Sequence, residues 1–308
     1  MEIIMEALKR VSPEKVGIHS QCIVDFIRQV RAEGIELHSL MILRHGKVCE
    51  EAWWKPYDSG TPQTMFSFSK SITSTAVGFA VQEGLLSLDE KLVDLFPNET
   101  PENPSENVKA ADVYSLLTMS CGQDSDIYYK LKSYDHWIYD FMHAEFKYKP
   151  GTMFQYNSTG TDMLCAIIKK KTGSEYLKPR LFDKIGMTNI SCRMLPGDIE
   201  MGGGGFRVKT EDMARLGQFY LNRGVWNGER LLNEEWIDMA TSRQISTVNP
   251  VFDNHDSNWQ HGYGFQFWRC IPEGLYRADG AYGQFAIMAP DKDAVIAMTS
   301  ASFSPDRL

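Results

Sequence analysis

A lysine that follows a serine by three residues is the feature of this sequence with the most definite chemistry. The stretch from Phe66 to Thr73, FSFSKSIT, contains the pair Ser67 and Lys70. Residues three apart lie on the same side of a helix, so the lysine amine can reach the serine hydroxyl. A neutral amine in that position can remove the hydroxyl proton and make the serine a nucleophile. Serine and lysine are common, however, and the spacing alone does not establish a catalytic pair.

The sequence after Ser67 predicts a helix that begins beside it. Apolar residues recur at helical spacing from Phe68 to Phe79, and Gly84 provides a natural end. The N-terminus of a helix has free backbone N–H groups and a positive dipole end, which suit an oxyanion formed at Ser67. A second Ser-x-x-Lys, from Ser12 to Lys15, lies before the first predicted helix and is better explained as a capped turn.

Tyr156 is a second candidate for chemistry. It lies in the turn-rich segment PGTMFQYNSTG (150–160), directly before a predicted helix. A phenol held close to Ser67 and Lys70 could relay a proton between the nucleophile and the leaving group. Without the serine motif, a buried tyrosine that anchors a loop would be the better interpretation.

Composition excludes several other classes of function. The 308 residues carry a net charge of -8, with 43% hydrophobic and 23% charged residues, as expected for a soluble globular protein. No basic run is long enough for nucleic acid, no apolar run is long enough for a membrane helix, and MEIIMEALKR is no secretory signal. We therefore expect a cytoplasmic protein that binds neither nucleic acid nor membrane.

Cysteine, histidine and glycine patterns indicate no cofactor. The six cysteines are scattered without a Cys-x-x-Cys pair, and the seven histidines are dispersed. We therefore expect reduced thiols and no metal site. The run GGGG at 202–205 lacks a following Lys-Ser/Thr and is interpreted as a flexible junction, not as a phosphate loop. The sequence has no Gly-x-Ser-x-Gly motif, which argues against an α/β-hydrolase.

The order of the predicted elements indicates an α+β fold with an antiparallel sheet flanked by helices. A hairpin turn at His45-Gly46 and several C-terminal strands suggest that both ends of the chain share one sheet. Residues 66–200 would form an inserted, mostly helical lobe, and residues 1–65 and 201–308 an α/β lobe of one catalytic domain, 1–308. The cleft between such lobes is where a ligand is expected.

The individual elements are predicted from hydrophobic periodicity and turn residues. Expected helices cover 20–34, 67–84, 110–120, 133–146, 159–173, 211–224 and 233–241. Thr210 is expected to cap the helix at 211–224. Expected strands of the C-terminal meander cover 262–270, 275–280, 283–290 and 294–301.

Taken in order, these motifs resemble the penicillin-recognising serine hydrolases. The closest resemblance is to the class C beta-lactamase-like branch, which includes esterases, D-amino-acid peptidases and amide hydrolases. The matching segments cover nearly the whole chain: FSFSKSITS, PGTMFQYNS, TEDMARLGQFYLNRGVWNGERLL and GYGFQFW…ADGAYGQ…MAPDKDAVIAMTS. The resemblance implies a beta-lactamase-like fold. It also implies a C-terminal helix that this chain, ending in FSPDRL, is expected to lack.

The family has three motifs, and two of them assign residues here directly. Ser67 and Lys70 match its Ser-x-x-Lys. Tyr156 matches the tyrosine of Tyr-x-Asn, and Ser158 stands in place of the asparagine. A hydroxyl at that position is found in esterase-like members, so the resemblance implies that Ser158 contributes to substrate binding.

The third motif, Lys-Thr-Gly or His-x-Gly on a strand, has a misleading literal match. The KTG at 171–173 ends a predicted helix, whereas the family needs its triplet on a strand that lines the cleft. The strand LYRADGAYGQF fits, and it places ADG (278–280) in that position. The resemblance then implies that Gly280 borders the substrate and that the backbone N–H of Ala281 completes the oxyanion hole with that of Ser67.

Asp279 stands where a beta-lactamase has a residue that holds the carboxylate of the drug. A carboxylate beside Asp279 would be repelled, which disfavours beta-lactam hydrolysis. Neutral esters or amides, or substrates with an amine that Asp279 binds, would fit better. The alternative is that Asp279 pairs with Arg277 or Arg207, and the sequence does not decide between these two interpretations.

The predicted function is that of a serine hydrolase that acts through an acyl-enzyme on small esters, amides or peptides, without a cofactor. Ser67 attacks the carbonyl, and Lys70, with its pKa lowered by desolvation, takes the proton together with Tyr156. Three alternatives remain open: a D-amino-acid peptidase or amidase, an acyltransferase, and a penicillin-binding sensor without turnover. The sequence leaves the oligomeric state undetermined.

Overall fold

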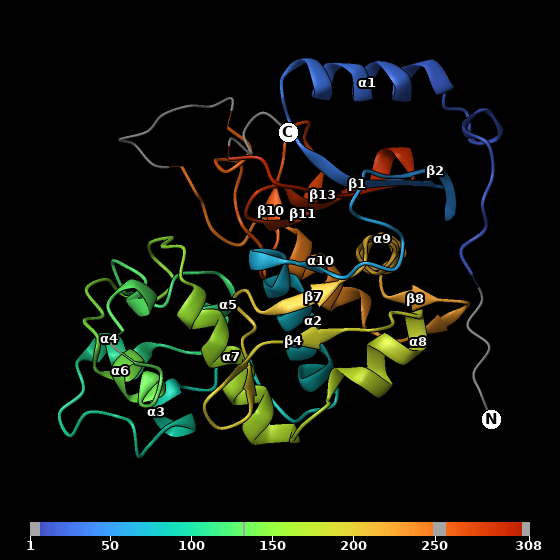
Figure 1. Cartoon of the computed structure of the whole chain (residues 1–308). Coiled ribbons are helices and arrows are strands. Elements are labelled where there is room, and N and C mark those ends of the chain that lie inside the picture. Colours follow the sequence, from blue (N-terminus) through green and yellow to red (C-terminus); the bar gives the residue numbers. More distant parts are fainter. Residues whose placement is uncertain (1–6, 132, 249–256, 304–308) are drawn as a thin grey trace.

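The computed structural model describes residues 7–131, 133–248 and 257–303 (Figure 1). Its main feature is a six-stranded antiparallel sheet in the order β10-β11-β12-β13-β1-β2. The strands are β1 (Leu37–Arg44), β2 (Lys47–Trp53), β10 (Trp268–Arg269), β11 (Tyr276–Gly280), β12 (Gln284–Ala289) and β13 (Ala294–Ser300).

The two ends of the chain meet in this sheet, because β1 pairs with β13. The hairpin between β1 and β2 turns at His45 and Gly46, whose φ angles of 52° and 67° are the positive values that a tight two-residue turn requires. The predictions of a shared antiparallel sheet flanked by helices and of an α+β fold are therefore confirmed.

Helices cover both faces of the sheet, and the side chains of β1 show why. Leu40 and Ile42 belong to the hydrophobic cluster that also contains Val30 of α1. Met41 and Leu43 point the other way, into the main core. Helix α1 lies along one face and α9 along the other (Figure 1).

Ten α-helices connect or cover the strands in the described ranges. They are α1 (Ser20–Ala32), α2 (Ser69–Gln82), α3 (Leu92–Leu95), α4 (Glu106–Ala110), α5 (Val113–Leu117), α6 (Trp137–His143), α7 (Ser158–Thr172), α8 (Asp183–Ile185), α9 (Thr210–Leu221) and α10 (Glu234–Thr241). Short 3₁₀ turns cover Pro13–Val16, Phe66–Phe68, Ile127–Tyr129 and Pro290–Lys292, and a π-helical turn covers Lys178–Phe182.

Short strands form three smaller sheets. The three-stranded one has the order β3-β7-β4, from β3 (Gln63–Thr64), β7 (Phe206–Val208) and β4 (Ser191–Cys192). The other two pair β5 (Met194–Leu195) with β6 (Ile199–Glu200), and β8 (Val225–Trp226) with β9 (Glu229–Arg230).

Helix α2 passes through the middle of the molecule and is buried on almost every side, although it is rich in hydroxyl residues. Several of its hydroxyls have partners inside the protein: Ser71 donates to Gln266 O at 2.7 Å, and Thr75 Oγ1 lies 2.8 Å from the Tyr220 hydroxyl. Buried polar groups are tolerated when they are hydrogen-bonded in this way. The nucleophile motif therefore lies at the end of a helix that the core fixes from all sides.

Four predicted elements differ from the structure. The helix predicted at 110–120 is shortened to α5. The strand predicted at 262–270 is limited to β10, because Gln266 has a φ of 65° and a Cβ on Gly264 would lie 2.0 Å from Ala240 O. The helix predicted at 133–146 is shortened to α6. Lys209, not Thr210, is the N-cap of α9, and the Asp212 carboxylate accepts the Lys209 N–H at 3.0 Å.

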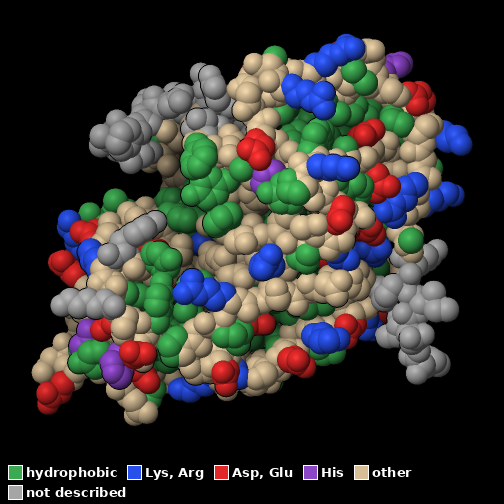
Figure 2. Space-filling model, viewed as in Figure 1, with side chains coloured by type: hydrophobic (Ala, Val, Ile, Leu, Met, Phe, Trp, Pro, Cys, Tyr) green, Lys and Arg blue, Asp and Glu red, His purple; other side chains and the backbone are tan. Residues whose placement is uncertain are grey.

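None of the described helices combines the length and the apolar character that a membrane crossing needs. Lys and Arg side chains are mixed with Asp and Glu over the face shown in Figure 2. The prediction about a missing C-terminal helix concerns the end of the chain, where residues 304–308 lie outside the described ranges.

Candidate active site

Ser67 lies in a tight turn immediately before α2. It is the middle residue of the 3₁₀ turn Phe66–Phe68, and Phe66 has a φ of 47°, in the left-handed region that non-glycine residues rarely adopt. Such a conformation costs about 1–2 kcal/mol and persists only where packing enforces it. Here Phe68 and Met65 are fully buried, and the Phe66 ring packs against Tyr282 with centroids 5.0 Å apart. The core thus holds the turn that presents Ser67.

Lys70 reaches Ser67 from the first turn of α2, as the sequence predicts. Its Nζ lies 3.1 Å from Ser67 Oγ and 3.1 Å from Ser158 Oγ, and it donates a third hydrogen bond to Gly203 O. These three acceptors satisfy a charged ammonium. When the amine loses a proton, its lone pair can accept the hydroxyl hydrogen of Ser67.

The surroundings of Lys70 favour that loss. The side chain is 1% exposed, and burial lowers its pKa to about 8, against the opposing charges of Asp162, Asp126 and Asp279. Desolvation disfavours the charged form of a lysine, whereas nearby carboxylates favour it. A substantial fraction of the Lys70 amine is therefore neutral close to physiological pH.

Tyr156 lies beside both residues. Its hydroxyl shares a hydrogen bond with Ser67, and Lys70 Nζ lies 5.0 Å from the centre of its ring. Trp268 stacks on the ring at 5.7 Å, and burial raises the pKa of the phenol far above its usual value. Tyr156 therefore stays protonated and is suited to pass a proton on, not to serve as a standing phenolate.

Ser158 is the first residue of α7, and two neighbouring side chains fix its position. Asn157 caps the helix by accepting the Gly160 N–H at 2.8 Å. Asp126 accepts the Ser158 N–H at 2.6 Å and the Thr159 hydroxyl at 2.7 Å. The structure thus places the Ser158 hydroxyl, which replaces the usual asparagine amide, against the Lys70 amine.

The interpretation of residues 202–205 as a flexible junction was wrong. The segment is an ordered turn against α2 and α7, and Gly203 supplies the carbonyl that accepts from Lys70. A Cβ on Gly202 would lie 2.3 Å from Thr73 Oγ1, and one on Gly203 would lie 2.7 Å from Ser158 O. Glycine is needed at both positions, because the backbone packs so closely against α2 and α7 that a side chain would clash.

Asp162 is a second residue that the sequence analysis missed. It lies one helical turn after Ser158, is 2% exposed, and accepts the Gly203 N–H at 2.8 Å. Burial raises the pKa of its carboxyl to about 7, although Gly203 and Lys70 oppose the shift. Asp162 therefore positions the Gly203 turn and stabilises the positive charge of Lys70. An aspartate among apolar residues of a predicted helix was the signal that could have identified it.

The end of β11 contacts the Ser67 turn directly. A Cβ on Gly280 would lie 2.1 Å from Met65 O and 3.1 Å from Phe68 N, so only glycine allows this approach. Ala281 follows and borders the same cavity as Ser67. This placement is compatible with the predicted oxyanion hole of the Ser67 and Ala281 N–H groups, which stays a prediction.

Asp279 has an internal partner. Its Oδ2 accepts a hydrogen bond from Arg277 Nε at 2.7 Å, and the two side chains are 10% and 5% exposed. The Arg277 guanidinium also packs over Trp259, 5.2 Å from its ring centre. Of the two interpretations of Asp279, the structure favours pairing with Arg277 over a carboxylate available to a substrate amine.

Ser67 and Ser158 open on a cavity of about 470 Å³. Its wall includes Ser67, Ser158, Gly203 and Ala281, together with two arginines discussed below.

The two other motif matches in the sequence lie away from this cavity. Ser12, of the second Ser-x-x-Lys, precedes the exposed turn Pro13–Val16, and the KTG at 171–173 ends α7 on the surface. In the described ranges no group of three or more His, Cys, Asp or Glu side chains could hold a metal ion.

Replacing Gly203 by alanine is expected to lower the free energy of unfolding by about 1–3 kcal/mol, because the new methyl group must displace Ser158 O and the Asp162 carboxylate. Urea unfolding followed by circular dichroism measures the effect. Gly204→Ala is the matched control, since its Cβ would meet no atom closer than 3.8 Å. Equal midpoints for the two variants would contradict the packing described for the turn.

The comparison with known families agrees with this geometry. A protein-family model described as beta-lactamase matches residues 23–308. The chain belongs to the beta-lactamase family. With its fold and neighbours, this places it in the superfamily of serine beta-lactamases and penicillin-binding proteins and makes it a beta-lactamase-like hydrolase.

Three proteins similar to the chain share between 15% and 24% of its residues. The 6-aminohexanoate-dimer hydrolase of Paenarthrobacter ureafaciens is 24% identical over 296 residues, which cover 87% of this chain and 73% of that protein. The octameric penicillin-binding protein homologue from Pyrococcus abyssi superposes with a TM-score of 0.74 at 22% identity, over 92% of this chain and 73% of that one. EstCE1, described as a hydrolase with promiscuous acyltransferase activity, has a TM-score of 0.75 at 15% identity, over 93% and 94%.

Proposed function

We infer that the protein is a serine hydrolase that cleaves esters or amides through an acyl-enzyme at Ser67. One observation carries this proposal: a buried Lys70 amine, with its pKa lowered to about 8, lies 3.1 Å from Ser67 Oγ. A serine becomes a nucleophile when a neighbouring base can take its proton, and a lysine serves as that base once burial has lowered its pKa.

The proposed reaction has two halves. Ser67 Oγ attacks the carbonyl carbon while its proton passes to Lys70, and the Ser67 and Ala281 N–H groups hold the oxyanion. Tyr156, which shares a hydrogen bond with Ser67, passes a proton to the leaving group as the acyl-enzyme forms and is reprotonated with the proton that Lys70 took from Ser67. Water then attacks the acyl group, and the same residues act in reverse.

Both ester and amide cleavage have support. The relative from Paenarthrobacter ureafaciens is named for the hydrolysis of 6-aminohexanoate dimers, whereas EstCE1 is described as a hydrolase with acyltransferase activity. Ser158 in place of the asparagine of beta-lactamases supports an ester substrate. We therefore propose ester hydrolysis first. An amidase is the second candidate, and the acyltransferase, in which an alcohol replaces water, is the third.

A small panel of substrates tests this proposal. We expect steady turnover of p-nitrophenyl acetate and butyrate, slower release from the matching p-nitroanilides, and little hydrolysis of nitrocefin. A burst of one equivalent of nitrophenol without later turnover would instead indicate a sensor that acylates but does not deacylate. No reaction with any ester would contradict the proposed hydrolase.

Replacing Tyr156 by phenylalanine is expected to lower kcat for p-nitrophenyl butyrate about 10²- to 10⁴-fold, because the proton relay is lost while the ring packing on Trp268 remains. Circular dichroism checks that the variant folds. Tyr139→Phe is the matched control, since Tyr139 is 49% exposed on α6. Retention of full activity in Tyr156→Phe would remove Tyr156 from the mechanism.

A further inference from the structure

Two arginines stand on the wall of the cavity that contains Ser67. Arg207 lies on β7, and Arg193 follows β4, the strand that pairs with β7. Arg193 N donates to Gly205 O at 3.0 Å, and a Cβ on Gly205 would lie 3.2 Å from Arg193 Cβ. Arg193 therefore lies opposite Gly205 and diagonally across from Arg207, on the same face of the β3-β7-β4 sheet. Long side chains can span the distance between two such diagonal neighbours.

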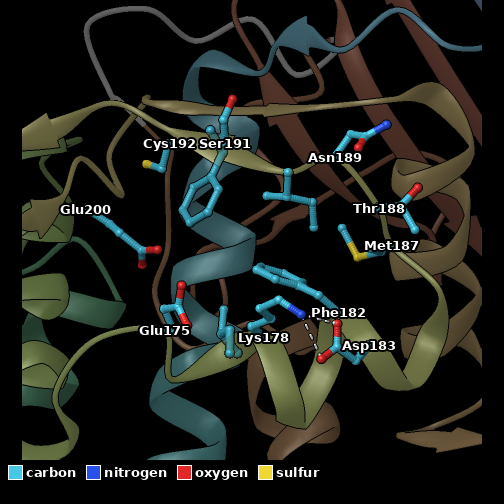
Figure 3. A pocket seen from close by; sticks show the side chains of 13 residues that line it. Glu175, Lys178, Phe182, Asp183, Met187, Thr188, Asn189, Ser191, Cys192 and Glu200 are labelled. Carbon is cyan, nitrogen blue, oxygen red and sulfur yellow. Dashed lines mark hydrogen bonds and ion pairs between the residues drawn. The ribbon is translucent and has the colours of Figure 1, made fainter. Parts of the chain in front are cut away.

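The strands direct these side chains to the catalytic side only. Neighbouring residues along a strand point to opposite faces. Phe206 and Cys192, next to Arg207 and Arg193, line a different pocket on the other face, shown in Figure 3. That pocket contains the carboxylates of Glu175, Asp183 and Glu200 and none of the catalytic residues. The basic pair and the nucleophile thus share one cavity, whose wall also includes Asp162, whereas the other pocket contains three carboxylates and Lys178.

The guanidinium groups of Arg193 and Arg207 have no hydrogen-bond or ion-pair partner within residues 7–131, 133–248 and 257–303. Both side chains are exposed, and no hydrogen bond or ion pair is formed by either. Other arginines of the chain are paired: Arg180 with Glu83, Arg223 with Glu234 and Asp238, and Arg277 with Asp279. Arg193 and Arg207 thus keep their charge available in a protein with 40 acidic and 32 basic residues.

The charge of this wall has a consequence for the substrate. A guanidinium matches a carboxylate in shape and binds it through two parallel hydrogen bonds. With Asp279 neutralised by Arg277, the repulsion expected from the sequence no longer opposes an acidic substrate. We propose that Arg193 and Arg207 bind a carboxylate of the substrate, so that the ester or amide cleaved at Ser67 carries an acid group. This rests on the proposed function of Ser67.

The backbone sets the spacing between the two groups. Arg207 pairs with Thr64, so their Cα atoms lie about 5 Å apart. Thr64 precedes Ser67 by three residues, which span at most about 11 Å. These two values are upper limits, and they place the arginines within reach of a flexible substrate chain whose carbonyl lies at Ser67. Half-esters of medium-length dicarboxylic acids are therefore suitable probes.

The test compares three esters of the same chain length. Mono-p-nitrophenyl adipate carries the acid, methyl p-nitrophenyl adipate is its uncharged counterpart, and p-nitrophenyl 6-aminohexanoate carries an amine. We expect kcat/KM for the acid to exceed that for the methyl ester about 10- to 100-fold, as hydrogen bonds to charged groups allow. The preference is also expected to shrink as salt is raised, since the arginines are exposed.

Variants then assign the preference to its residues. The ratio of kcat/KM for acid over methyl ester is expected to fall towards one in Arg193→Gln/Arg207→Gln and to recover partly in the double lysine variant. Arg28→Gln, on α1 with a side chain 71% exposed, is the matched control and should leave the ratio unchanged. A ratio near one in the wild type, a ratio kept by the glutamine variant, or preference for the amine would overturn the proposal. Absence of hydrolysis of all three esters would instead reject the proposed function.

Discussion

The Ser67→Ala variant is expected to lose at least about 10⁴-fold in kcat for p-nitrophenyl butyrate and all labelling by a fluorophosphonate probe. The alanine keeps the turn Phe66–Phe68 and the packing of Phe68, but no oxygen remains to attack the carbonyl. Intact-protein mass spectrometry measures the label, and one adduct per chain is expected for the wild type. A small remaining rate would come from the oxyanion site and substrate binding alone.

The chain offers a matched control for this experiment. Ser12 also precedes a lysine by three residues but lies in an exposed turn, so Ser12→Ala should react and label like the wild type. Labelling of Ser67→Ala at the wild-type rate would mean that another residue is the nucleophile. Loss of activity in both variants would indicate a general effect on folding, which the unfolding midpoint detects.

Replacing Lys70 by methionine is expected to lower kcat/KM about 10²- to 10⁴-fold, because the neutral side chain fills the buried space but cannot take the proton of Ser67. The control is Lys15→Met, in the other Ser-x-x-Lys, which should leave the rate unchanged. Wild-type turnover in Lys70→Met would show that the base is a different group.

The pH profile tests the same residue through its proton. Only the neutral amine is active, and its pKa is lowered to about 8, so kcat/KM should rise about tenfold per pH unit below pH 8 and level off above it. Asp162→Asn removes a negative charge that favours the charged amine, so the rise should move to lower pH. The asparagine oxygen can still accept from Gly203 N–H. An unchanged profile in this variant would contradict the electrostatic role of Asp162.

The Ser67 and Lys70 pair could be predicted because it depends on local geometry. Residues three apart at the start of a helix meet whatever the rest of the chain does. Tyr156 was a candidate because it precedes a predicted helix, the resemblance added Ser158, and the structure brings both to Lys70. The antiparallel sheet could be predicted from the period-two patterns at both ends of the chain.

The parts that escaped prediction depend on contacts between distant segments. Gly203 and Asp162 meet Lys70 only after α2, α7 and the 202–205 turn pack together, and a glycine run alone resembles a flexible linker. The aromatic alternation at 262–267 imitates a strand, but Gln266 turns with a positive φ and donates to Leu117 O at 2.8 Å. Tertiary packing overrides the local pattern in such segments.

The most direct test of the account is to locate the acyl group on the enzyme. The wild type is mixed with p-nitrophenyl butyrate, quenched in acid within the first turnovers, digested, and analysed by fragmentation mass spectrometry. The account predicts one butyryl group on Ser67, with neither Ser69 nor Ser71 modified. A butyryl group on another residue, or steady turnover without any covalent adduct, would contradict it.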